Sequence, residues 1–116
     1  AYLIDSPLMR AESLRFSESG VREVVRTVLL PLWNAYSFFT TYAEADGITM
    51  TDLRSAPQVS DRPELDRWLL SVLQSLIQNV NTEMEGYYLY NVVGPTLSFI
   101  DDLTNWYIRR SRRRFW

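Results

Sequence analysis

The chain has 116 residues, a net charge of −2 and 47% apolar residues, which suits one small domain with a modest hydrophobic core. It contains no Cys, His or Lys, which excludes disulfides, thiolate or imidazole metal ligands, histidine general bases and Schiff-base lysines. No apolar run approaches the roughly 20 residues that a membrane-spanning helix needs. We therefore expect a cytoplasmic protein without membrane association, and no catalytic residue, metal site or cofactor within these residues.

The N-terminal third of the sequence predicts a connector followed by a long helix. Residues 1–20 mix short apolar pieces with turn-forming residues and show no sustained period, so we interpret them as the connector. The helix begins near Val21, with Ser19 as its N-cap, and ends at Asp46-Gly47. Pro31 removes one backbone hydrogen bond inside it and predicts a kink near residue 28. Apolar residues recur three and four positions apart along this stretch: Val21, Val24, Val25, Val28, Leu29, Leu32, Trp33, Tyr36 and Phe39.

A loop and a second helix follow. Residues 47–62 are rich in Gly, Thr, Pro and Ser and predict a long loop, with one short helical turn at Thr51 to Ala56. Pro63 suits the first turn of a helix, so we place the second helix at about 63–85. Its apolar stripe consists of Leu65, Trp68, Leu69, Val72, Leu73, Leu76, Ile77, Val80 and Met84.

The third helix begins near Tyr87, and Gly94-Pro95 is expected to kink or break its first half. No stop signal precedes Trp116, so the helix is expected to run to the end of the sequence. Its apolar stripe consists of Leu89, Val92, Val93, Leu97, Ile100, Leu103, Trp106 and Tyr107.

These patterns predict an all-α fold, because no segment alternates polar and apolar residues for long enough to build a sheet. Three long amphipathic helices indicate an antiparallel up-down-up bundle over residues 21–116. Since the third helix does not end, we expect this helical domain to be incomplete. Apolar faces left uncovered by missing helices would then favour self-association.

The last eight residues contain five arginines that alternate with aromatic rings, and carry +5 against −7 for the rest of the chain. A guanidinium can bind two phosphate oxygens or stack on a base, and an aromatic ring offers a second stacking face, so the segment favours RNA. Helical spacing divides the arginines between two faces, so we expect at least two to contact RNA and others to pair with upstream carboxylates such as Glu64, Asp66, Glu83 and Glu85. One face holds Arg109, Arg112 and Arg113, and the other Arg110 and Arg114.

Asn105 joins these arginines as a candidate, since its amide can pair with a base edge or tie two helices together. The predicted RNA-binding residues are Asn105, Arg109, Arg110, Arg112, Arg113 and Arg114.

The aromatic residues of the same segment have two interpretations. They can serve as stacking platforms, but aromatics at helical spacing are more often core, and we expect Trp106 to be buried. Phe115 and Trp116 could instead pack against missing helices. Trp33 and Trp68 lie on apolar stripes and are predicted to be core.

The segment from Asp101 to Trp116, with the sequence DDLTNWYIRRSRRRFW, resembles the characteristic tract of isoleucyl-tRNA synthetases. Further matching pieces follow the family's order: YLIDSP at residues 2–7, LRFS at 14–17, VLLPLWNAY at 28–36 and LDRW at 65–68. The resemblance covers nearly the whole chain. It implies a helical anticodon-binding domain that recognises isoleucine-specific tRNA.

The same resemblance implies a parent enzyme that attaches isoleucine to its tRNA with ATP and magnesium. The family's two catalytic motifs need His and Lys, which this chain lacks, so we expect these residues to be inactive alone. One alternative remains open: a helical interaction domain whose arginine-rich end binds an acidic protein or an anionic surface.

Overall fold

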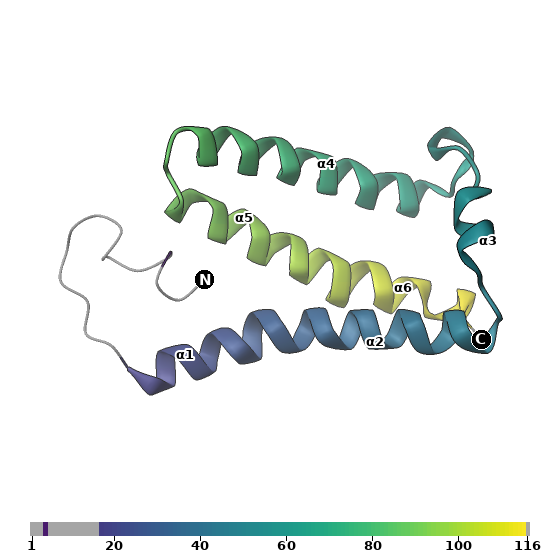
Figure 1. Ribbon diagram of the computed structural model, residues 1–116, viewed down its shortest axis with the longest axis horizontal. Coiled ribbons are helices and arrows are strands. Elements are labelled where there is room, and N and C mark those ends of the chain that lie inside the picture. The colour runs from purple at the N-terminus through teal and green to yellow at the C-terminus, as the bar shows by residue number, and fades with distance from the viewer. Residues whose placement is uncertain (1–3, 5–16, 116) are drawn as a thin grey trace.

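The computed structural model describes Ile4 and residues 17–115, and all regular elements within them are helical (Figure 1). The first long rod comprises α1 (Glu18–Val24), the π-helical segment η2 (Val25–Leu29) and α2 (Leu30–Ala45). The second rod is α4 (Glu64–Glu85). The third comprises α5 (Tyr90–Asp101), the π-helical segment η4 (Asp102–Ile108), α6 (Arg109–Ser111) and the 3-10 turn η5 (Arg112–Arg114).

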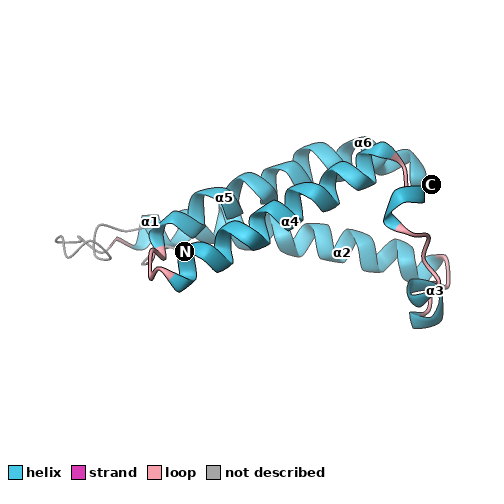
Figure 2. Ribbon diagram, turned by 90° about the horizontal axis from the view of Figure 1, so that it is seen from above, coloured by secondary structure: helices cyan, strands magenta, loops and turns pink. Residues whose placement is uncertain are grey.

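The three rods run up, down and up, and the third contacts both of the others (Figures 1 and 2). The predicted all-α antiparallel bundle of three long helices is confirmed. Between the first and second rods lie α3 (Met50–Arg54), close to the predicted short turn, and the 3-10 turn η3 (Val59–Asp61). The connector expected at residues 1–20 falls almost entirely outside the described residues.

The first helix begins earlier than its apolar pattern predicted. Ser17, not Ser19, is the N-cap: its backbone is extended and its hydroxyl accepts a hydrogen bond of 3.2 Å from the Gly20 amide. Glu18 then lies in the first turn, where a negative charge favours the helix dipole, and pairs with Arg22 at 2.6 Å. The polar first turn therefore belongs to the helix although it adds nothing to the apolar stripe.

Pro31 lies near the start of α2, immediately after the π-helical turn η2. A proline has no amide hydrogen, so the carbonyl four residues before it loses its usual partner. The Leu30 amide instead reaches back five residues to the Val25 carbonyl, which is the π-helical spacing. The irregularity expected near residue 28 is thus a wider turn, and Figure 1 shows α1 inclined to α2 there.

Of the two outcomes expected at Gly94-Pro95, a kink or a break, the break does not occur, because α5 continues through Pro95. The ring of a proline normally clashes with the Cβ of the residue before it and drives that residue out of helical geometry. Gly94 has no Cβ and removes this clash. The apolar residues on either side can then stay in one stripe against α4, with which α5 makes extensive contact.

Much apolar surface of the bundle is open. Among the described residues only Ile100 and Ser111, both on the third rod, are fully buried. The predictions that Trp33 and Trp106 are core residues are wrong, since they are 65% and 48% exposed, whereas Trp68 is half-buried. Trp33 and Trp106 do lie on the periodic apolar stripes, but no described helix covers these parts of the stripes. Self-association through such faces stays a prediction.

The C-terminal ends of α2 and α4 use the same backbone motif with different residues. In α2, Gly47 has φ +67°, and the Ile48 amide donates to the Ala43 carbonyl at 2.9 Å. In α4, Tyr87 has φ +60°, and the Tyr88 amide donates to the Glu83 carbonyl at 2.9 Å. Glycine is preferred at this left-handed position, but in α4 the glycine, Gly86, lies one residue too early.

Replacing Tyr87 with glycine should therefore raise the free energy of unfolding by about 1 kcal/mol, because a non-glycine residue pays roughly that amount in the left-handed region. Gly47→Ala should lower it by about 1 kcal/mol for the same reason. Urea unfolding followed by circular dichroism measures both. The control is Tyr87→Ala, which removes a ring that is 86% exposed but keeps the Cβ. If Tyr87→Ala stabilised the fold as much as Tyr87→Gly, that result would contradict the backbone explanation.

Candidate nucleic-acid interface

The arginine-rich end of the third rod is fixed to the start of α4 by one polar cluster. Arg114 donates two hydrogen bonds to the Asp66 carboxylate, at 2.5 Å to Oδ1 and 2.9 Å to Oδ2. The Tyr107 hydroxyl donates a third, at 2.9 Å to Oδ1. The Asp66 side chain is only 12% exposed, so its charge depends on these partners. Arg114 is therefore a structural residue, as expected for some members of the tract.

The cluster shifts the ionisation of its members in a consistent direction. The Arg114 guanidinium and the Tyr107 hydroxyl stabilise the carboxylate and lower the pKa of Asp66, although partial burial opposes this. Burial and the adjacent carboxylate raise the pKa of Tyr107, and the carboxylate also raises the pKa of Arg114. At neutral pH the cluster therefore holds a carboxylate, a phenol and a guanidinium cation.

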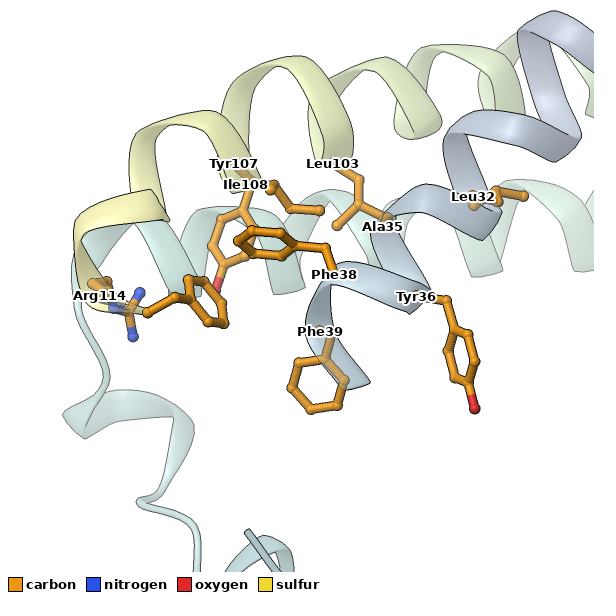
Figure 3. A pocket seen from close by; sticks show the side chains of 10 residues that line it. Leu32, Ala35, Tyr36, Phe38, Phe39, Leu103, Tyr107, Ile108 and Arg114 are labelled. Atoms are coloured by element: carbon orange, nitrogen blue, oxygen red, sulfur yellow. The ribbon is translucent and has the colours of Figure 1, made fainter. Parts of the chain in front are cut away.

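Aromatic packing completes this end of the bundle. The Phe115 ring meets Phe38 edge to face at 4.9 Å and lies 5.8 Å from the Tyr42 ring. Phe115 therefore packs against α2, which agrees with the core interpretation of the aromatic residues in this segment. The Phe38 and Phe115 rings border an apolar groove that also includes Leu103 and Arg114 (Figure 3). Trp116 lies outside the described residues.

The remaining four arginines are free of carboxylates within the described part of the chain. Arg110 lies over the Trp106 ring, with its guanidinium carbon 4.5 Å from the ring centroid. The side chains of Arg109, Arg112 and Arg113 are exposed and make no hydrogen bond or ion pair to another described residue. These three are the arginines that helical spacing assigned to one face. Their charges remain available to an anionic ligand.

Asn105 and Arg112 lie together on a second groove, between α2 and the third rod. The cavity measures about 430 Å³, and the Asn105 amide also donates a hydrogen bond of 2.6 Å to Asp101 within its own rod. Asn34 of α2 faces the same groove and was missed as a candidate. The available signal was its polar side chain within the apolar run VLLPLWNAY. The groove is lined by Pro31, Asn34, Ala35, Phe38, Thr104, Asn105, Ile108 and Arg112.

Two other kinds of site have no counterpart in the described residues. No three carboxylates gather as they would around a metal ion in Ile4 and residues 17–115. None of the helices in that part of the chain is long and apolar enough to cross a membrane. The best-supported candidate site is the cationic surface beside the groove, formed by the exposed side chains of Arg109, Arg112 and Arg113.

Comparisons with known proteins agree on one family. Residues 66–116 match the model of the anticodon-binding domain of tRNA ligase. Over 99% of its length the chain is similar to the isoleucine–tRNA ligase of Bdellovibrio bacteriovorus, with 51% identity, and covers 10% of that protein. Isoleucine–tRNA ligases of Chlamydia muridarum and Treponema pallidum are 51% and 40% identical, with 11% of each covered. The chain thus spans about a tenth of the length of these curated relatives.

The Asp66 cluster predicts a large effect of Asp66→Asn on stability. The variant should lower the free energy of unfolding by about 1–3 kcal/mol at pH 7, because Arg114 and Tyr107 lose their ionised acceptor. The folded-state pKa of Asp66 lies below its ordinary value of 3.8, so the carboxylate stabilises the fold above that pH. This stabilisation is lost as the pH falls through the folded-state pKa. The difference between wild type and variant should therefore shrink in acid.

Urea unfolding between pH 7 and pH 2 measures this difference. Tyr107→Phe is the matched control, since it removes one hydrogen bond and leaves the ion pair, and should cost only about 1 kcal/mol. A difference between wild type and Asp66→Asn that does not depend on pH would contradict a role for the carboxylate charge.

Proposed function

We propose that this chain, which corresponds to the anticodon-binding region of the isoleucine–tRNA ligases, binds tRNA through the exposed cationic end of its third rod. The observation that carries the proposal is the separation of Arg109, Arg112 and Arg113 from every described carboxylate, while Arg114 alone is committed to Asp66. Exposed arginines gain affinity for RNA by displacing the counterions of its phosphates.

The longer protein containing such a region would attach isoleucine to its tRNA in the cytoplasm, using ATP with magnesium. That activity is part of the proposal, because the chain spans about a tenth of its relatives. Within the proposal these residues contribute binding and orientation only, since they contain neither His nor Lys for the two catalytic motifs of the family. The bundle acts as a rigid support that holds the anticodon stem–loop far from the chemical step.

The bundle geometry supports a role in positioning. The Asp66 cluster and the Phe38–Phe115 contact fix the end of the third rod against α4 and α2 respectively. Arginines on a fixed rod present their charges at set distances, which favours a folded RNA of matching shape over an arbitrary polyanion. An acidic protein or an anionic membrane surface would make less use of this rigidity.

The double variant Arg109→Gln, Arg113→Gln should weaken binding of the chain to an isoleucine tRNA transcript. It should also reduce the slope of log affinity against log salt by about 1.4–1.8, which is the contribution of two phosphate contacts. Fluorescence anisotropy between 50 and 300 mM KCl is the measurement. The matched control is Arg54→Gln, Arg67→Gln, which removes the same charge from two exposed arginines that form no described ion pair.

Equal effects of the two double variants would indicate a general charge effect and contradict the proposed surface. Binding of heparin or phosphatidylserine vesicles as tight as that of tRNA would favour the anionic-surface alternative. No binding of tRNA by the wild-type chain at 50 mM KCl would contradict the proposal for these residues.

A further inference from the structure

We propose that Ile4 anchors the N-terminal segment of the chain in an apolar groove at the end of the bundle opposite the arginines. This N-terminal groove has a volume of about 320 Å³ and is bordered by all three rods. The cationic surface has no part in it, so the inference goes beyond the proposed function. The described lining of the N-terminal groove comprises Ile4, Val28, Met84, Leu89, Val92, Val93, Thr96 and Leu97.

The N-terminal groove lies where the turn between α4 and α5 approaches the first rod. Met84 is in the last turn of α4, and Val92 is in the first turn of α5. Val28 belongs to η2, which contacts α5 directly. Figure 1 shows the turn between α4 and α5 at one end of the bundle and α6 at the other. An anchor in this groove is therefore remote from the Asp66 cluster.

Ile4 is the one described residue that precedes Ser17 in the sequence. It belongs to none of the three rods, yet it is only 38% exposed, so most of its surface is covered. A branched aliphatic side chain is stabilised in proportion to the apolar area that it removes from water. The residues that border the groove with it are remote in the sequence. Tertiary packing therefore sets the position of Ile4.

The chemistry of the lining favours an aliphatic side chain at this position. Thr96 carries the only polar side chain among the described lining residues, and its hydroxyl already donates a hydrogen bond of 2.8 Å to the Val92 carbonyl. No charged side chain borders the groove within the described part of the chain. A polar group placed here would lose its water without gaining a partner, whereas an aliphatic side chain needs none.

The π-helical turn η2 accounts for the part that the first rod plays in this groove. A π-helical turn contains more residues than an α-helical turn, so it rotates the side chains before it relative to those after it. Val28 in this turn is half-buried and lines the groove, whereas the next residue, Leu29, is exposed. The wider turn that precedes Pro31 therefore lies where the first rod meets α5 and borders the groove.

The bundle is then fixed at its two ends by different forces. The ion pair between Asp66 and Arg114 fixes the arginine-rich end, and the apolar burial of Ile4 fixes the N-terminal segment at the other. Within the proposed function, on which this consequence rests, the bundle is a support that is attached at one end and presents Arg109 and Arg113 at the other.

The chain contains no Cys, so a pair of introduced thiols tests the position of Ile4 directly. The double variant Ile4→Cys, Met84→Cys is treated at low protein concentration with dibromobimane, which fluoresces once it has joined two neighbouring thiols. The intramolecular product should form about tenfold faster than in the control Ile4→Cys, Met50→Cys, because the first pair has the higher effective concentration. Met84 and Met50 are both exposed, but Met50 lies on α3 at the opposite end of the bundle (Figure 1).

The same two variants in concentrated urea provide the internal control. In an unfolded chain the shorter loop, from residue 4 to residue 50, closes more readily than the loop from residue 4 to residue 84. The order of the two rates should therefore reverse when the bundle unfolds. Mass spectrometry of tryptic peptides confirms which residues are joined.

The variant Ile4→Ser tests the anchor without added thiols. Loss of the aliphatic side chain should let η2 and the start of α5 open more often, so amide hydrogen exchange in these two segments should quicken several-fold. The matched control is Ile48→Ser, which changes an exposed isoleucine that is absent from the described lining. Circular dichroism checks that both variants are folded. The affinity for tRNA should stay unchanged in both, so this inference and the proposed function fail separately.

Three results would overturn the inference. The first is an equal rate of crosslinking for the two thiol pairs in the folded chain. The second is a faster reaction of the Ile4→Cys, Met84→Cys variant that persists in urea. The third is equal amide exchange in η2 and α5 for Ile4→Ser and Ile48→Ser.

Discussion

The interaction on which the arginine-rich end of this bundle depends is the ion pair between Asp66 and Arg114, with Tyr107 as its third member. Asp66 is more than 40 positions from both of its partners in the sequence, and the ion pair joins the first turn of α4 to the last turn of the third rod. Two hydrogen bonds to one carboxylate fix orientation as well as distance. It adds a directional contact to the apolar packing of α5 on α4.

This commitment of one arginine determines what the others can do. A continuous helical rod fixes the directions of its side chains relative to each other, so fixing Arg114 on α4 also sets where Arg109, Arg112 and Arg113 project. The cationic charge of this end is divided: the Arg114 guanidinium pairs with Asp66, whereas those of Arg109, Arg112 and Arg113 have no carboxylate partner among the described residues. A rigid support that carries unpaired cations is suited to a polyanion of fixed shape.

Long periodic stretches could be predicted well from the sequence, as shown by the second helix, expected at 63–85 and found at Glu64–Glu85. Its amphipathic pattern and its flanking proline and glycine agree with each other. Local rules failed where tertiary context decided the outcome: Gly94 accommodates Pro95, and Trp33 stays exposed despite its position on an apolar stripe. The polar side chain of Asn34 within an apolar run was a local signal, but its place in the groove could not be predicted, because Asn105 and Arg112 on the same groove lie some seventy residues away in the sequence.

The unequal lengths of the two connections shape how the bundle can move. A tight turn joins α4 to α5, whereas a long segment containing α3 separates the first rod from α4. Closing a short loop costs little chain entropy, so α4 and α5 form a hairpin that persists while more distant partners detach. The first rod is the element whose displacement disturbs the fewest neighbours. Detachment of the first rod would thus leave the Asp66–Arg114 pair, and with it the end of the third rod, joined to α4.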